Sequence, residues 1–150
     1  MSINEVLEHS VTATKILFDR KGLELIKDIR ADLPLFSGDR GRIIQVVINL
    51  LSNAAKFTET GDVTVSAVIE GQDIVVRVTD TGLGVSEDEA HIIFDKFRQL
   101  GDVLTDKPRG SGLGLAISLE IMEHHGGSLW YEPAKGGGSV FGFSIPIKED

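Results

Sequence analysis

The chain has 150 residues, the length of a single domain. Its 15 Lys and Arg residues against 23 Asp and Glu residues give a net charge of −8, opposite in sign to what binding of nucleic-acid phosphates needs. The absence of cysteine excludes disulfides, thiolate zinc sites and a cysteine nucleophile, and there is no apolar run of the roughly 20 residues that a membrane helix requires. Glycine is abundant: ten of its 17 copies lie between Gly101 and Gly142.

The first 60 residues predict a helix, a short strand and a second helix. Ser2 and Glu5 have the spacing of a capping box, and apolar residues follow at helical intervals as far as about Arg20. The segment 23–29 predicts an edge strand. Asp39 is a suitable N-cap for a helix that ends near Phe57.

The remainder alternates between strands and helices. We expect the following order: a β-hairpin over 63–78 that turns at 71–72, a helix over 86–98, a loop over 101–112, a helix from 113 that ends at 126–127, and closing strands over 128–132 and 139–147. This mixture predicts an α/β fold, a two-layer sandwich in which a mixed, mainly antiparallel sheet packs on one layer of helices.

The second predicted helix is apolar around most of its circumference and carries one narrow polar line. The line consists of Arg42, Gln45, Asn49, Asn53 and Lys56. A solvated helix face is the simplest explanation, but such faces favour Glu and Lys, and asparagine is a poor helix former. Two asparagines four residues apart could together face a magnesium ion, with the lysine on the same side for an anion.

Asp80 continues the alternation of the apolar strand over 74–78, so its carboxylate is expected to point toward the buried face. A turn aspartate is the alternative, since Thr81-Gly82 follows. A buried carboxylate needs a donor, and the exocyclic amine of adenine is one. Gly82 and Gly84 would then let the backbone approach a planar base.

Glycines also alternate through GSGLGL, residues 110–115, where they precede a predicted helix. Unpaired amides at a helix start bind phosphate. The segment is not a Walker loop, because no Gly-Lys-Ser/Thr follows, and no strand runs directly into it as in a Rossmann fingerprint. Arg98, Lys107 and Arg109 flank it and could either neutralise phosphate charge or be ordinary loop cations.

Four segments in this order resemble the N box, first glycine box, F box and second glycine box of sensor histidine kinases: NLLSNAAKFT (49–58), DTGLGV (80–85), IFDKFRQ (93–99) and GSGLGLAI (110–117). The resemblance extends over essentially the whole chain, including the closing GGGSVFGFSIPI. It implies a catalytic, ATP-binding domain of the Bergerat or GHKL fold over 1–150, shared with gyrase B, ninety-kilodalton heat-shock chaperones and mismatch-repair ATPases. Residues 1–20 would form a leading helix after an acceptor hairpin that the chain lacks.

The resemblance also implies roles for individual residues. Asn53 would be the magnesium ligand, Asn49 would support the metal and phosphate side as a catalytic residue, and Lys56 would contact phosphate in catalysis and binding. Asp80 would accept a hydrogen bond from the adenine amine. The other implied cofactor-binding residues are Gly82 and Gly84 in the adenine pocket, Phe94 and Phe97 as anchors of a lid over about 98–111, Arg98, and Gly110, Ser111, Gly112, Leu113 and Gly114 around the triphosphate. Gln99 stands where many relatives have arginine, which leaves open whether Arg98 reaches the γ-phosphate.

The same comparison favours a kinase, an ATP-dependent protein-histidine phosphotransferase of a two-component system. Hydrolases of this superfamily place a glutamate four residues before the metal-binding asparagine, where Asn49 stands, and an amide is no general base. None of the four histidines, His9, His91, His124 and His125, sits in an acceptor motif. We therefore expect ATP and Mg²⁺ as cofactors, and a phosphoacceptor histidine domain of the same kinase as the direct partner.

A response-regulator receiver domain would be the indirect partner. We expect no contact of this domain with nucleic acid or membrane, and a cytoplasmic location whether or not the full-length protein is membrane-anchored. The alternatives are a GHKL-type ATPase and a non-catalytic nucleotide-binding module.

Overall fold

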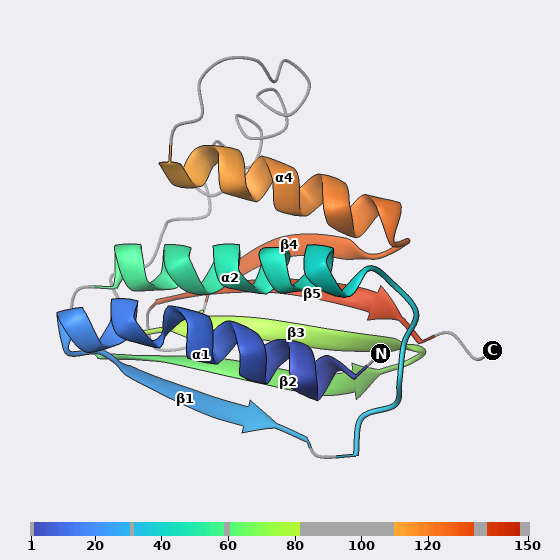
Figure 1. Cartoon of the computed structure of the whole chain (residues 1–150), viewed down its shortest axis with the longest axis horizontal. Coiled ribbons are helices and arrows are strands. Elements are labelled where there is room, and N and C mark those ends of the chain that lie inside the picture. Colours follow the sequence, from blue (N-terminus) through green and yellow to red (C-terminus); the bar gives the residue numbers. More distant parts are fainter. Residues whose placement is uncertain (1, 31, 59–60, 82–109, 134–137, 148–150) are drawn as a thin grey trace.

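The computed structural model describes residues 2–30, 32–58, 61–81, 110–133 and 138–147. Its elements are α1 (Ile3–Lys21), β1 (Glu24–Ile29), α2 (Arg40–Phe57), β2 (Asp62–Glu70), β3 (Asp73–Asp80), α4 (Gly110–His124), β4 (Ser128–Pro133) and β5 (Ser139–Pro146). The strands form one sheet in the order β1-β2-β3-β5-β4. Strand β1 runs parallel to β2 and the other pairs are antiparallel, and the described helices α1, α2 and α4 lie on one face of the sheet (Figure 1).

This architecture is the predicted two-layer α/β sandwich with a mixed, mainly antiparallel sheet. Strand β1 is an edge strand, and β2 and β3 form the predicted hairpin. The expected loop over 101–112 is wrong at its end, because α4 already begins at Gly110. The helix expected over 86–98 lies outside the described residues.

The core lies between the helix layer and the sheet. The apolar side of α2 is fully enclosed, with Val46, Val47, Leu50 and Leu51 all at 0% exposure. The facing side chains come from alternate strand positions, because successive residues of a strand point to opposite faces. Those on the helix side of the sheet include Val63, Val65, Ile74, Val76, Phe143 and Ile145.

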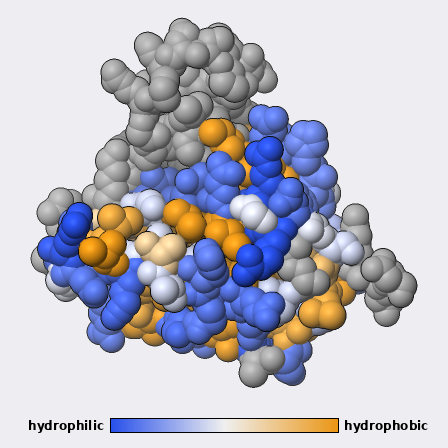
Figure 2. All heavy atoms as spheres, in the orientation of Figure 1, coloured by the Kyte–Doolittle hydropathy of each residue, from blue (hydrophilic) through white to orange (hydrophobic). Residues whose placement is uncertain are grey.

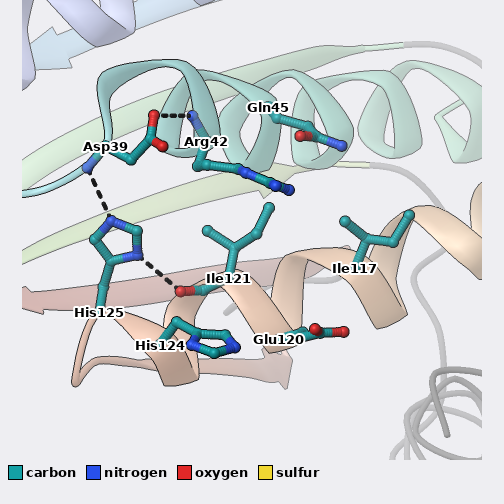
Figure 3. Close-up of a pocket in the computed structure, with 8 residues that line it drawn as sticks. All are labelled: Asp39, Arg42, Gln45, Ile117, Glu120, Ile121, His124 and His125. Atoms are coloured by element: carbon teal, nitrogen blue, oxygen red, sulfur yellow. Dashed lines mark hydrogen bonds between the residues drawn. The ribbon is translucent and has the colours of Figure 1, made fainter.

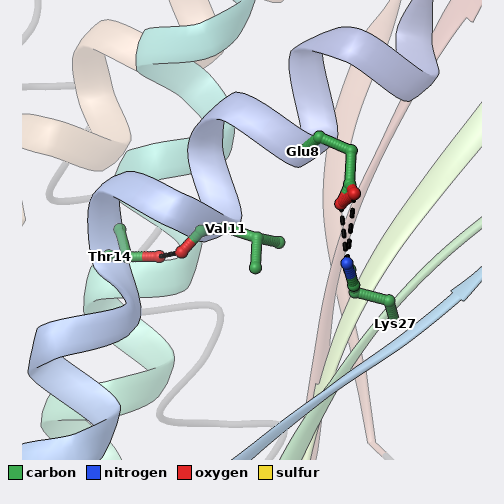
Figure 4. A network of polar contacts seen from close by, with 4 residues as sticks. All are labelled: Glu8, Val11, Thr14 and Lys27. Carbon is green, nitrogen blue, oxygen red and sulfur yellow. Dashed lines mark hydrogen bonds and ion pairs between the residues drawn. The ribbon is translucent and has the colours of Figure 1, made fainter.

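Helix α1 packs against α2 and is fixed at both ends. The Ser2 hydroxyl accepts a hydrogen bond from the Glu5 amide, and Gly22 ends the helix in the left-handed conformation with φ of 70°. A salt bridge of 2.7 Å between Lys27 Nζ and Glu8 Oε1 ties β1 to this helix (Figure 4). The buried hydroxyl of Thr14 donates within the helix to the carbonyl of Ser10 at 2.9 Å.

The surface over the helices is mainly hydrophilic, with separate apolar patches (Figure 2). Large apolar side chains that stay exposed include Ile16, Leu17 and Leu35. None of the helices that the structure describes is long and apolar enough to cross a membrane.

The face of the sheet away from the helices carries a charged cluster around Arg77 of β3. Its Nη1 donates to Glu70 Oε2 at 2.8 Å and its Nε donates to Glu132 Oε1 at 3.1 Å. The guanidinium carbon also lies 5.8 Å from the centre of the Trp130 ring. Trp130 therefore packs within this cluster.

Candidate functional site

The polar line of α2 faces α4 and divides into two halves. Asn49 is half-buried, and its Nδ2 donates to Ser118 Oγ of α4 at 3.1 Å. Toward the start of α2, Arg42 and Gln45 are exposed, whereas Asn53, one turn after Asn49, is only 3% exposed. The line is therefore not a solvated face throughout, because Asn53 is enclosed.

The buried half ends in polar atoms that lack partners. Asn53 Nδ2 and Thr58 Oγ1 are both buried without a hydrogen bond, and Thr58 is 0% exposed. Leaving a buried donor unpaired costs about 1–3 kcal/mol, and native proteins leave few such groups. The unpaired Nδ2 of Asn53, on the polar line of α2, indicates a place where a bound molecule supplies the missing partner.

Asp80 is the last residue of β3 and points to the helix side of the sheet, as predicted, with 4% exposure. Ser139, its partner on β5, holds both carboxylate oxygens. The Ser139 amide donates to Oδ1 at 3.3 Å and the Ser139 hydroxyl donates to Oδ2 at 3.0 Å. These bonds fix the orientation of a buried acceptor, and the carboxylate can accept more than two hydrogen bonds.

The approach of β5 to Asp80 depends on Gly138. Its φ of 93° is unfavourable for other residues, and a Cβ there would lie 1.9 Å from the carbonyl oxygen of Asp80. Sequence reasoning missed Ser139. The signal was present, because Ser139 is a polar residue in phase with Phe141, Phe143 and Ile145, which point into the core.

The glycine-rich segment forms the first turns of α4 instead of a loop in front of it. Gly110, Gly112 and Gly114 lie within the helix, so its free amides belong to the motif itself. In Figure 1, the end of α2, the end of β3 and the start of α4 lie at the same end of the molecule. The structure thus brings Asn53, Asp80 and the glycine motif to one end of the helix layer.

Several predicted site residues cannot be placed. Gly82, Gly84, Phe94, Phe97 and Arg98 lie outside the described residues. The side chains of Lys56, Ser111 and Leu113 are likewise not described, although their backbones belong to α2 and α4. The roles of all eight residues stay predictions.

A hollow lies at the other end of the same two helices (Figure 3). It is a pocket of about 470 Å³, lined by Asp39, Arg42, Gln45, Ile117, Glu120, Ile121, His124 and His125. The Asp39 carboxylate accepts from the Arg42 amide at 3.2 Å and caps α2. The Asp39 amide in turn donates to His125 Nε2 at 3.0 Å. Both the carboxylate and the amide of Asp39 therefore have hydrogen-bond partners at this end of α2.

Comparison with known proteins was made by family and by structure. The family model described as histidine kinase-, DNA gyrase B-, and HSP90-like ATPase matches residues 38–149. Sensor protein GacS of Pseudomonas syringae pv. syringae is 34% identical over 152 residues, which cover 97% of this chain and 17% of GacS. Adaptive-response sensory kinase SasA of Thermosynechococcus vestitus is 36% identical over 152 residues, which cover 98% of this chain and 39% of SasA.

Two solved structures resemble the chain over nearly its whole length. The catalytic domain of histidine kinase ThkA in a nucleotide-free form has a TM-score of 0.81 and 30% identity, and the match covers 97% of this chain and 93% of that one. Full-length ShkA in complex with AMPPNP has a TM-score of 0.83 and 31% identity, and the match covers 100% of this chain and 31% of that one. The chain thus spans less than two fifths of GacS, SasA and full-length ShkA.

Proposed function

The chain belongs to the family of histidine kinase-, DNA gyrase B- and HSP90-like ATPases, as an ATP-binding catalytic domain of the sensor histidine kinase type, and we propose that it positions Mg-ATP for transfer of the γ-phosphoryl group to a histidine on a separate phosphoacceptor domain. The observation that carries this proposal is the buried, unpartnered side-chain nitrogen Nδ2 of Asn53 at the same end of the fold as the fixed carboxylate of Asp80. The Asn53 nitrogen needs a ligand atom as its hydrogen-bond partner, and the Asp80 carboxylate is an oriented acceptor.

Asp80 selects the base in this proposal. Adenine presents an exocyclic amine as donor, whereas guanine has a carbonyl oxygen in the corresponding place. A carboxylate held by Ser139 accepts from the amine and repels the carbonyl. The site is therefore expected to prefer ATP over GTP, with Gly82 and Gly84 giving the base room.

Asn53 fits a magnesium ion through the chemistry of its side chain. Magnesium takes amide oxygens together with phosphate oxygens and water, and it neutralises the charge that develops during phosphoryl transfer. The Asn53 amide would turn its oxygen to the metal, and its Nδ2, unpaired in this fold, would be free to donate to a phosphate oxygen. Asn49 and Lys56 would support the phosphates, together with the amides at the start of α4.

Asn49 favours transfer over hydrolysis. An amide cannot remove a proton from water near neutral pH, and Asn49 Nδ2 is already engaged with Ser118 Oγ. The nucleophile would be an imidazole of the phosphoacceptor domain, and the receiver domain of a response regulator would take the phosphoryl group afterwards. A GHKL ATPase would instead release phosphate steadily without any acceptor.

Calorimetric titration of Mg-ATP tests the proposal, with wild type, Asn53→Ala, Asp80→Asn and the control Asp73→Asn at the opposite end of β3. We expect binding to wild type and to the control, and a loss of about tenfold or more in each site variant, because both remove a bond to a charged or metal-bound group. Equal affinities for all four proteins would contradict the site.

The transfer step has its own experiment. Incubation with γ-labelled ATP alone should leave the chain unlabelled, and addition of a phosphoacceptor hairpin should give labelled hairpin. Steady phosphate release without the hairpin would favour the ATPase instead.

A further inference from the structure

His125 connects α4 to the start of α2, at the end of these helices away from Asn53. The Asp39 amide donates to His125 Nε2 at 3.0 Å, and His125 Nδ1 lies 2.8 Å from the carbonyl oxygen of Ile121 (Figure 3). Gly38 leaves room for the ring, because a Cβ there would lie 2.8 Å from His125 Cδ2. The imidazole therefore bridges two segments that are 86 residues apart in the chain.

The two contacts fix the proton of the ring. A backbone amide can only donate, so Nε2 must be the unprotonated acceptor. The proton then resides on Nδ1, which donates to the Ile121 carbonyl. Each nitrogen has one role, and the neutral ring with its proton on Nδ1 satisfies both contacts.

Two of the hydrogen bonds that join α4 to α2 lie at separate points along α4. Asn49 holds Ser118 near the middle of the helix, and Asp39 holds His125 just after its end. At about 1.5 Å per residue, these points are about 10 Å apart, and Gly110 lies about 12 Å beyond Ser118 on the other side. The buried side chains of Leu119, Ile121 and Met122 also attach α4 to the core, and the two hydrogen bonds add directional contacts at two fixed points along the helix.

We propose that His125 is a positioning residue for nucleotide binding, which aims the glycine-rich start of α4 at the phosphates held beside Asn53. Because Ser118 lies near the middle of α4, a displacement at His125 moves Gly110 by a similar distance in the opposite sense. Hydrogen bonds weaken steeply with distance and angle, so the amides at Gly110 lose contact with phosphate when the far end is released. The inference rests on the proposed function, since it presupposes that the start of α4 binds nucleotide phosphate.

Two amide substitutions separate the two contacts of the imidazole. In His125→Asn the side-chain amide reaches only the position of Nδ1 and can donate to Ile121, but it leaves the Asp39 amide without an acceptor. In His125→Gln the side-chain oxygen reaches the position of Nε2 and can still accept from Asp39. The hydrogen bond from the Asp39 amide to residue 125 is thus lost in the first variant and kept in the second.

The measurement is the Kd of Mg-ATP by calorimetry, with the Tm of each variant. We expect His125→Asn to weaken binding about tenfold, the value of one lost hydrogen bond that orders the site, and His125→Gln to stay within about threefold of wild type. Equal binding by wild type and both variants would overturn the proposal. Equal losses of affinity in both variants would also overturn it, because the imidazole ring as a whole, and not the atom that accepts from Asp39, would then be what binding requires.

Two controls separate positioning from general stability. His124→Gln changes the neighbouring exposed histidine and should bind as wild type does. Leu23→Ala removes a buried side chain between α1 and β1 and should lower the Tm at least as much as His125→Asn without changing the Kd. A Kd that simply follows the Tm across these variants would overturn the proposal.

The imidazole nitrogens give a readout that needs no variant to fold. In ¹⁵N NMR spectra of the wild-type protein, we expect His125 to carry its proton on Nδ1 and to show an unprotonated Nε2, whereas a protonated Nε2 would overturn the proposal. If wild type does not bind Mg-ATP at all, the proposed function fails; if wild type binds and the variants match it, only the role of His125 fails.

Discussion

The two ends of α2 differ in how their polar groups are satisfied. At the first end, Asp39 caps the helix through the Arg42 amide and donates its own amide to His125. At the last end, Asn53 Nδ2 and Thr58 Oγ1 are buried without partners. The described polar groups are thus hydrogen-bonded at the first end of the helix and buried without partners at its last end. We call these the closed end and the open end.

The difference distinguishes polar groups that stabilise the fold from polar groups that are available to a ligand. Paired groups at the closed end stabilise the contact between α2 and α4, whereas unpaired groups at the open end each cost about 1–3 kcal/mol. A folded domain has only about 5–15 kcal/mol of stability, so this cost is considerable. At Asn53 the cost would be compensated by the proposed ligand, so stability and binding should respond in opposite directions there.

Asn53→Leu should give the largest effect among the variants that test this difference. Leucine has a similar shape but no polar atom, so the unpaired donor disappears and the free energy of unfolding without ligand should stay the same or rise by about 1 kcal/mol. The Mg-ATP affinity should fall about 100-fold, since the proposed metal ligand is lost. Calorimetric titration and thermal unfolding measure the two effects.

Gln45→Leu is the matched control for that change, because it replaces an exposed amide on the same helix line. It should leave both the affinity and the Tm close to wild type. A large loss of stability in Asn53→Leu, or an unchanged affinity, would contradict the assignment of the open end.

Ser139→Ala should have the next largest effect. The substitution removes the hydroxyl that donates to Asp80 Oδ2 and leaves the amide that donates to Oδ1. A lost hydrogen bond to a charged group corresponds to about a tenfold fall in ATP affinity. Ser144→Ala on the same strand removes a hydroxyl that bonds to Ser128 Oγ and should not alter the affinity; equal effects of the two would argue against a role for Ser139 in orienting Asp80.

The sequence was sufficient for features that depend on local pattern. The apolar side of α2 and the inward side of β3 follow from helical and strand periodicity, and the inward carboxylate of Asp80 follows from the same alternation. The start of α4 at Gly110 did not follow, because glycine is a poor helix former and only the folded chain overrides that preference. The bond from Asp39 to His125 spans 86 residues, and no local pattern reveals it.

Two buried threonines test the rule of paired and unpaired groups with smaller effects. Thr58→Val should raise the free energy of unfolding by about 1 kcal/mol, because it removes a hydroxyl without a partner. Thr14→Val should lower it by about the same amount, because the Thr14 hydroxyl donates to Ser10. Chemical denaturation of both variants without ligand gives the two values, and changes of the same sign would show that the absence of a partner does not set the cost at Thr58.

The charged cluster on the other face of the sheet should give the smallest effect and so provides a baseline for both ends of α2. The hydrogen bond from Arg77 to Glu70 holds the pKa of the Glu70 carboxyl below its ordinary value of 4.5, and the same bond raises the pKa of Arg77. A carboxyl whose pKa is lower in the folded state stabilises the fold above its unfolded pKa, and that contribution is lost as the pH falls through the folded value. Glu70→Gln should therefore lower the Tm slightly at pH 7 and not at all well below pH 4.5.

Because Glu70 is exposed, added salt should shrink the difference in Tm at pH 7. The effects of substitutions at Asn53 and Thr58 on stability should persist in salt, since they arise from buried neutral groups. A Glu70→Gln effect that grows toward acid pH would contradict the ion pair.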